Sequence, residues 1–250
     1  MNIENKFDFN RIPENTPFNT RLMVSLTADK IGNIDDKSLN IAVVLDRSGS
    51  MSGDKIEYVK TATKILGRQL NQDDFLSLTI YDDVVDILIP STEMKNMHGF
   101  NESVNSIQPG GMTYLSGGYQ KGYTLAKENK SENNISRLML LTDGLANEGI
   151  TDPDQLASIA LKMNNEGITT STIGVGEDYD EFLLGKMAEN GGGGTYYIEN
   201  PDDAPSVFQE ELGYLKSLAA TKITVKFVPK NSGLKVAQLN TYRINDDSPT

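Results

Sequence analysis

Three segments that read as buried strands constrain the fold of this chain more than any other feature, and the first is a continuous apolar run rich in β-branched residues. They are LNIAVVL (39–45), RLMLLTDG (137–144) and ITTSTIGVG (168–176). A strand that is apolar at every position is typical of a parallel sheet, because such a strand is buried on both faces. We therefore expect these runs to be central strands with helices on either side.

Helical patterns separate the runs. Residues 53–70 place Ile56, Val59 and Leu66 on one helical face, and Asp152 with Pro153 marks the start of another helix. The segments DFLSLTIYDD and VVDILIP are joined so tightly that they predict a hairpin, which makes one edge strand antiparallel. Alternating strands and helices predict an α/β fold with a Rossmann-like, doubly wound and mostly parallel sheet.

The two ends of the chain have a different pattern. TRLMVSLTA near the start, and TKITVKFVP and LKVAQLNTYRI near the end, are strand-like segments with no helix between them. We expect them to form a small antiparallel β module. The predicted organisation is an N-terminal strand segment (1–36), a main domain (37–219) and C-terminal strands (220–250) that end short of a longer natural chain.

Composition excludes several classes of function. The net charge of -12 argues against a nucleic acid as partner, because phosphate binding needs clustered Lys and Arg. The absence of cysteine excludes a disulfide framework and a thiolate metal site. No segment reads as a signal peptide or as a membrane span. We expect a soluble protein, cytoplasmic if Met1 is the native start and extracellular or surface-tethered if a signal segment has been removed.

Oxygen-bearing side chains follow the central strands. Asp46, Ser48 and Ser50 alternate in DRSGS, directly after the first apolar run, and Asp143 ends the second. The carboxyl ends of parallel strands meet at one edge of the sheet, where a loop carrying Thr113 can join them. Such a set of hard oxygens without imidazole or thiolate selects Mg²⁺, or Mn²⁺ or Ca²⁺, over zinc or copper. The sequence therefore predicts a metal site made by Asp46, Ser48, Ser50, Thr113 and Asp143.

These motifs carry a family resemblance. DRSGS, the threonine of GGMT and the aspartate of LLTDG resemble the metal-ion-dependent adhesion site (MIDAS) of von Willebrand factor type A domains, over residues 37–219. LNIAVVLDRSGSM, RLMLLTDGLANEGITD, TSTIGVG and GGTYYI are similar to bacterial calcium-activated chloride channel homologues and to inter-alpha-trypsin inhibitor heavy chains. The channel label does not fit a chain without a membrane span.

The resemblance implies a protein-binding module rather than an enzyme. The partner would offer an Asp or Glu carboxylate to the open position of the metal. Ser48, Ser50 and Thr113 are expected to bind the ion directly, and Asp46 and Asp143 directly or through water. Some relatives couple this exchange to movement of the last helix, here 205–219, and we predict no such switch for this chain.

Other interpretations compete with this one. Asp46 and Asp143 are also typical turn residues. Asp46 after a buried strand is also typical of the nucleophile in a Mg²⁺-dependent phosphoryl-transfer enzyme, although Ser48 stands where such an enzyme needs an acid. Asp82, Asp83 and Asp86 suggest a second metal cluster, but a solvated hairpin edge explains them better. His98 is expected to be exposed, the glycines at 191–194 to form a mobile turn, and Tyr196 and Tyr197 to lie in a strand.

Overall fold

The computed structural model describes residues 2–9, 11, 13, 16–27, 37–177 and 179–217, with single residues and one short stretch between 223 and 239. The chain divides into two units, Met1–Leu218 and Ala219–Thr250. In the segment 221–229, predicted to be a strand, residues 223 and 225–228 are described and none of them lies in a strand. The segment 234–244, also predicted to be a strand, lies mostly outside the described residues. None of the described helices is long and apolar enough to cross a bilayer.

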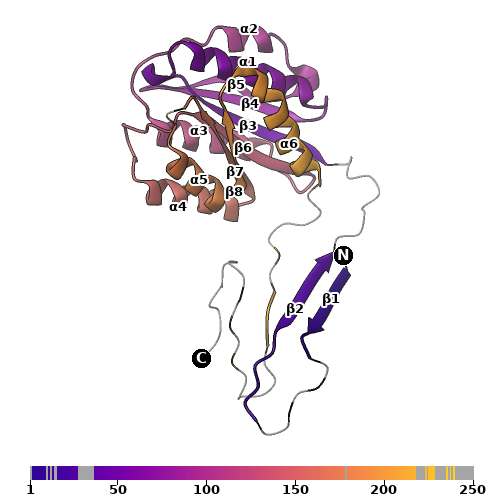
Figure 1. Ribbon diagram of the computed structural model, residues 1–250. Helices are drawn as coiled ribbons and strands as arrows, with labels where there is room; N and C mark the ends of the chain where they lie inside the picture. Colours follow the sequence, from indigo (N-terminus) through magenta and orange to yellow (C-terminus); the bar gives the residue numbers. More distant parts are fainter. Residues whose placement is uncertain are drawn as a thin grey trace. The chain divides into compact units, whose positions relative to one another are not determined.

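A six-stranded sheet in the order β5-β4-β3-β6-β7-β8 is the centre of the main domain (Figure 1). The five strands from β4 to β8 in this order run parallel to one another, and the edge strand β5 runs antiparallel to β4. The strand bounds are β3 (Ser38–Asp46), β4 (Phe75–Tyr81), β5 (Val85–Glu93), β6 (Asn134–Thr142), β7 (Ile168–Val175) and β8 (Gly192–Ile198). This topology confirms the predicted doubly wound sheet and its antiparallel edge.

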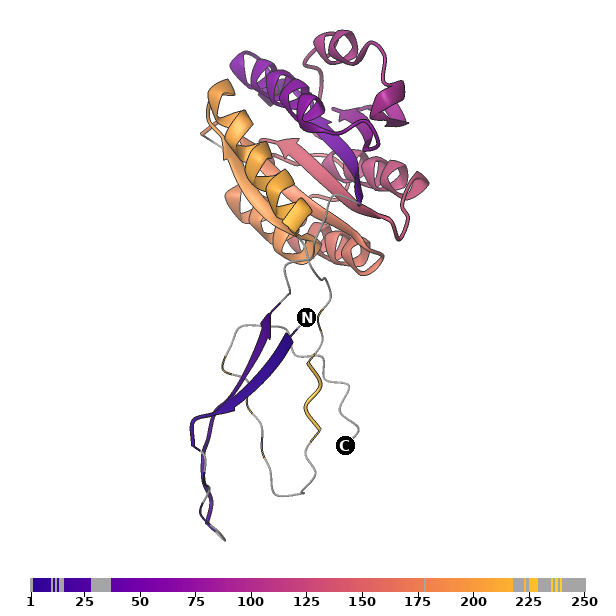
Figure 2. The same cartoon turned by 90° about the vertical axis from the view of Figure 1, so that its right-hand side faces the viewer.

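Helices cover both faces of this sheet. Their bounds are α1 (Asp54–Gln69), α2 (Phe100–Asn105), α3 (Leu115–Glu128), α4 (Pro153–Asn165), α5 (Glu181–Gly191) and α6 (Ala204–Ser217). Figures 1 and 2 show α6, in orange, beside α1, in purple, on one face. In β3, Val43 packs into the core beneath α1 and α6, and Val44 packs into the core beneath α3, α4 and α5. This alternation explains why residues 41–45 are all apolar.

The strand order creates a topological switch beside β3. Strand β3 pairs with β4 on one side and with β6 on the other, both in parallel. From β3 the chain therefore winds toward β4 and β5, and later returns to the other side for β6. Side chains at the carboxyl ends of β3 and β6 thus lie at the position where open α/β sheets bind ligands.

One strand was not predicted from the sequence, and one prediction was wrong. Strand β1 (Asn2–Phe7) was not predicted, yet it pairs antiparallel with β2 (Leu22–Thr27). The glycines at 191–194 do not form a turn, because Gly191 ends α5 and the other three begin β8. A side chain at Gly193 would collide with the carbonyl oxygen of Thr170 and with the guanidinium of Arg137, so packing explains this glycine.

Candidate metal site

The first part of the site is the turn that follows β3. Asp46 is the last residue of the strand and is fully buried. Its Oδ1 accepts a hydrogen bond of 2.8 Å from the backbone N–H of Ser48, which closes a local turn. The Oγ atoms of Ser48 and Ser50 then lie 3.1 Å apart, with Ser48 buried and Ser50 exposed. The alternating oxygens of DRSGS therefore gather on one side of the turn.

Two residues outside the predicted set hold the other carboxylate oxygen of Asp46. Thr142 donates its hydroxyl to Oδ2 at 2.6 Å, and Tyr81 donates its phenol at 3.3 Å. The pKa of Asp46 is raised to about 6: burial is the main cause and the nearby Asp143 a smaller one, while the hydrogen bonds from Thr142 and Ser48 act in the opposite direction. The site thus holds a carboxylate that is costly to ionise without a cation.

Asp143 directly follows β6 and is also fully buried. Its Oδ2 lies 3.3 Å from Nζ of Lys55, in the first turn of α1. Its backbone carbonyl accepts a 2.9 Å hydrogen bond from the N–H of Asp180, at the start of α5. Asp143 is therefore fixed by its backbone and faces a lysine with its side chain.

Thr113 lies in a loop that is fastened to both of these segments. The N–H of Gly110 donates to the carbonyl of Arg47 at 2.7 Å, and the N–H of Gly49 donates to the carbonyl of Gly111 at 2.8 Å. Thr113 itself is buried, and its backbone N–H donates a 2.8 Å hydrogen bond to Oδ1 of Asn147. Three segments from distant parts of the sequence are thus joined around the carboxyl ends of β3 and β6.

The acidic hairpin between β4 and β5 supports the Thr113 loop. Asp82 is buried and lies 3.2 Å from Nε of Arg47, whose Nη2 contacts Asp86 at 3.1 Å. Any Cβ at Gly110 would collide with the Asp82 carboxylate. The prediction of a solvated edge is confirmed for the exposed Asp83 and Asp86. It is wrong for Asp82, because Arg47 and the glycine loop enclose it.

The donor chemistry fits a hard divalent ion. Among the described residues, no group of three or more Asp, Glu or His side chains is placed to hold a metal. A metal at this edge of the sheet would therefore need hydroxyl ligands beside its carboxylates, and Ser48, Ser50 and Thr113 supply them. The charge of Asp143 also raises the pKa of Asp46, which favours a cation near that buried carboxylate.

The sequence patterns missed the residues that orient this site: Thr142, Tyr81, Asn147, Arg47 and Lys55. Only Thr142 and Arg47 adjoin a predicted ligand in sequence, in LLTDG and DRSGS. Tyr81 ends a strand 35 positions after Asp46. Nothing in a single sequence indicates that its phenol meets that carboxylate.

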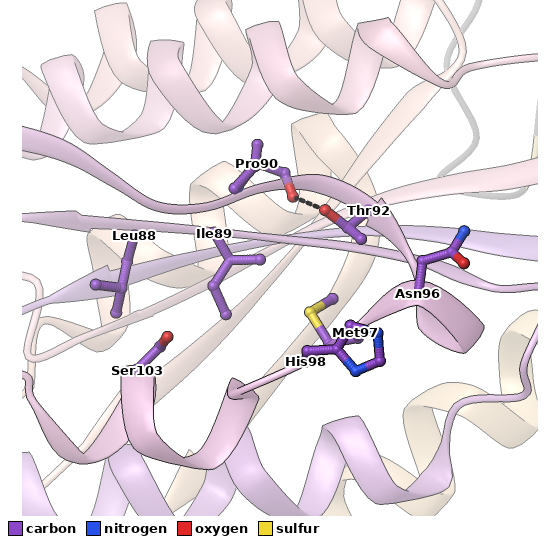
Figure 3. A pocket seen from close by; sticks show the side chains of 8 residues that line it. All are labelled: Leu88, Ile89, Pro90, Thr92, Asn96, Met97, His98 and Ser103. Atoms are coloured by element: carbon purple, nitrogen blue, oxygen red, sulfur yellow. Dashed lines mark hydrogen bonds between the residues drawn. The ribbon is translucent and has the colours of Figure 1, made fainter.

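A separate pocket of about 230 Å³ lies between β5 and α2. It is lined by Leu88, Ile89, Pro90, Thr92, Asn96, Met97, His98 and Ser103, and Figure 3 shows His98 beside Met97 at one end. His98 is exposed, as predicted. None of the five predicted metal ligands lines this pocket.

Comparison with known proteins agrees with this architecture. The Escherichia coli protein YfbK is 27% identical over 92% of this chain and 42% of its own length. Human inter-alpha-trypsin inhibitor heavy chain H3 is 26% identical over 82% of this chain and 24% of its own length. This chain therefore spans less than half of these relatives.

Solved structures share the fold. A von Willebrand factor type A protein from Catenulispora acidiphila superposes with a TM-score of 0.58 at 19% identity, covering 76% of this chain and 43% of that one. Proximal thread matrix protein 1 of the mussel byssus, in a structure with a zinc-occupied MIDAS motif, has a TM-score of 0.55 at 16% identity, covering 71% and 48%. The sequence profile of the von Willebrand factor type A domain matches residues 40–210. The chain therefore belongs to the von Willebrand factor type A domain family.

Proposed function

We propose that this protein binds a partner protein through a divalent metal ion held by Asp46, Ser48, Ser50, Thr113 and Asp143. The observation that carries the proposal is the juxtaposition of Asp46 and Asp143, both fully buried at the ends of neighbouring strands. Two such carboxylates are disfavoured as a bare pair, and a cation relieves their repulsion. Mg²⁺ is the proposed ion, with Mn²⁺ and Ca²⁺ as alternatives of the same oxygen-binding class.

The hydrogen bonds at the site suggest which residues bind the ion directly and which bind it through water. Both carboxylate oxygens of Asp46 already accept bonds from Ser48 N–H, Thr142 and Tyr81, so we assign Asp46 to hold the ion through water. Ser48, Ser50 and Thr113 supply neutral hydroxyls as direct ligands. The bound ion would act as a Lewis acid, and a site with few direct anionic ligands leaves it attractive to a carboxylate from outside.

The partner would therefore present an Asp or Glu side chain at the carboxyl edge of the sheet. The divalent ion attracts such a carboxylate, whereas the protein itself, with a net charge of -12, repels it. Partner binding should consequently require the metal. A chelator should abolish it, and added Mg²⁺ should restore it.

Phosphoryl transfer from Asp46 is the competing function. A nucleophilic carboxylate has to reach the phosphorus atom of its substrate. Asp46 has no exposed surface and is held by three donors, which argues against that role.

Titration with Mg²⁺ or Mn²⁺, followed by thermal unfolding, tests the proposal. Ligand binding to the folded state alone raises the unfolding temperature in a saturable manner. The wild type should respond, and Asp46→Ala and Thr113→Ala should not. A pull-down from source cells, with Mg²⁺ or with chelator, should recover a partner only with the wild type and metal. Metal-dependent hydrolysis of generic phosphate esters by the wild type, lost in Asp46→Ala, would favour the enzyme instead.

A further inference from the structure

Lys55 is the charged side chain that meets the candidate metal site from the first turn of α1. Its Nζ lies 3.3 Å from Oδ2 of Asp143. The lysine side chain is 18% exposed and the aspartate is fully buried, so the pair is only partly screened by water. Lys55 thus offers a positive charge to a carboxylate that the metal would also use.

The backbone that follows β7 lies against the side chain of this lysine. Gly176 follows β7 with φ of +80°, and a Cβ at this position would meet the Cε of Lys55, with its Cδ at 3.2 Å. A residue with a side chain would therefore push the lysine away from Asp143. Because Gly176 has no side chain, the stem of Lys55 can pass close to this backbone and reach the carboxylate of Asp143.

The position of Lys55 is unfavourable for the helix itself. The N-terminal turn of a helix carries partial positive charge, so acidic side chains stabilise it and lysine does not. Asp54 and Glu57 are the acidic residues of this turn. Lys55 extends from the same turn to Asp143, so it makes an ionic contact with the site.

We propose that Lys55 is an internal counter-ion that competes with the divalent ion for Asp143 and so sets the metal affinity of the site. The proposal rests on the proposed function, because it concerns the same metal site. In the metal-free protein the ammonium neutralises Asp143. When the divalent ion binds, it and the ammonium repel each other at short range. The ion therefore has to share the Asp143 carboxylate with the lysine or displace the lysine from it.

Removal of the charge therefore has opposite effects on the two states. Lys55→Met keeps the apolar stem and deletes the ammonium. Without metal, the variant should unfold at a lower temperature than the wild type, because Asp143 is left buried without its cation. With metal, its affinity for Mg²⁺ should rise about tenfold, because the competing charge is gone. The difference in unfolding temperature should shrink or reverse at saturating Mg²⁺.

Three further variants control the experiment. Lys64→Met deletes a charge from the same helix, at a lysine that contacts Asn105 Oδ1 rather than the site, and should leave the Mg²⁺ affinity unchanged. Lys55→Arg keeps the charge and should bind Mg²⁺ about as weakly as the wild type. Lys55→Gln is a polar second variant in case the methionine variant does not fold, and it should show the same rise in affinity.

The measurement is calorimetric and thermal titration of each protein with Mg²⁺ alone, and with Mn²⁺ alone. If the wild type binds metal and neither Lys55→Met nor Lys55→Gln binds it more tightly, the counter-ion role is wrong while the metal site stands. If only Lys55→Met and Lys55→Gln respond, the lysine blocks the site and the inference is supported. If no protein responds, both the proposed function and the counter-ion role fail.

Discussion

The hydroxyl of Thr142 donates a 2.6 Å hydrogen bond to Oδ2 of Asp46, although 96 positions separate the two residues. The same hydroxyl accepts the N–H of Gly144 at 2.8 Å, so it links the end of β6 to the end of β3. A residue outside the predicted ligand set thus orients a central carboxylate of the candidate site.

Thr142→Val should weaken metal binding. Valine is nearly isosteric but lacks the hydroxyl, so it removes a hydrogen bond to a charged group and leaves the Gly144 N–H without its acceptor. Such a loss costs about 1.5–3 kcal/mol in the free energy of unfolding. Because this bond also lowers the pKa of Asp46, its loss should weaken Mg²⁺ binding as well. Calorimetric titration measures the change in Mg²⁺ affinity. Thr142→Ser retains the hydroxyl and should bind like the wild type, and equal losses in both variants would assign the effect to packing.

Metal binding should weaken in acid because Asp46 has a raised pKa of about 6, against an ordinary value of 3.8. The folded, metal-free protein therefore gains stability from protonated Asp46 below pH 3.8, and this contribution is lost as the pH rises through about 6. The ion has to displace that proton. The rise in unfolding temperature caused by Mg²⁺ should be small at about pH 5 and complete at about pH 7.5. A rise independent of pH would mean that Asp46 is not protonated in the metal-free site.

Gly110→Ala should disturb the loop that carries Thr113. The added Cβ collides with the carboxylate of Asp82, which Arg47 and the N–H of Val84 hold in place. We expect a loss of about 1–3 kcal/mol in the free energy of unfolding, together with weaker Mg²⁺ binding. Urea denaturation and calorimetry check both effects.

Gly185→Ala is the matched control for that substitution. A Cβ at Gly185, inside α5, meets nothing within 4 Å. Alanine is the better helix former, so this variant should gain about 0.5–1 kcal/mol in stability and bind Mg²⁺ unchanged. A similar loss of metal affinity in both glycine variants would contradict the role assigned to the Gly110 contact.

Glu211→Ala should be the most destabilising of these changes. Glu211 on α6 lies 3.0 Å from Nε of the buried Arg137 and accepts bonds of 2.7 Å from Ser171 and Tyr196. Breaking a buried pair leaves an uncompensated charge and costs about 3–5 kcal/mol. Urea denaturation of the metal-free protein measures this cost. Glu210→Ala, on the exposed side of the same helix, should change stability by less than about 0.5 kcal/mol.

The sequence by itself determined the layers of the main domain. Residues 41–45 are apolar at every position because Val43 and Val44 face different cores, and this pattern leaves few arrangements other than a covered parallel sheet. It also determined where the oxygens cluster, since polar residues that follow buried parallel strands end at one edge. Local chemistry was sufficient for the start of α4, where Asp152 accepts the N–H of Gln155.

Only the tertiary structure decided which strands are neighbours and which side chains meet. Asp46 approaches Asp143 because β3 pairs with β6, and the partners Tyr81, Lys55 and Thr142 come from segments 35, 88 and 96 positions away from the aspartates they contact. Packing likewise decided that Asp82 is buried and that the glycines after 191 form a strand over Arg137. Periodicity is a property of neighbouring residues, whereas these contacts depend on how distant segments pack, so the pattern of one sequence does not contain them.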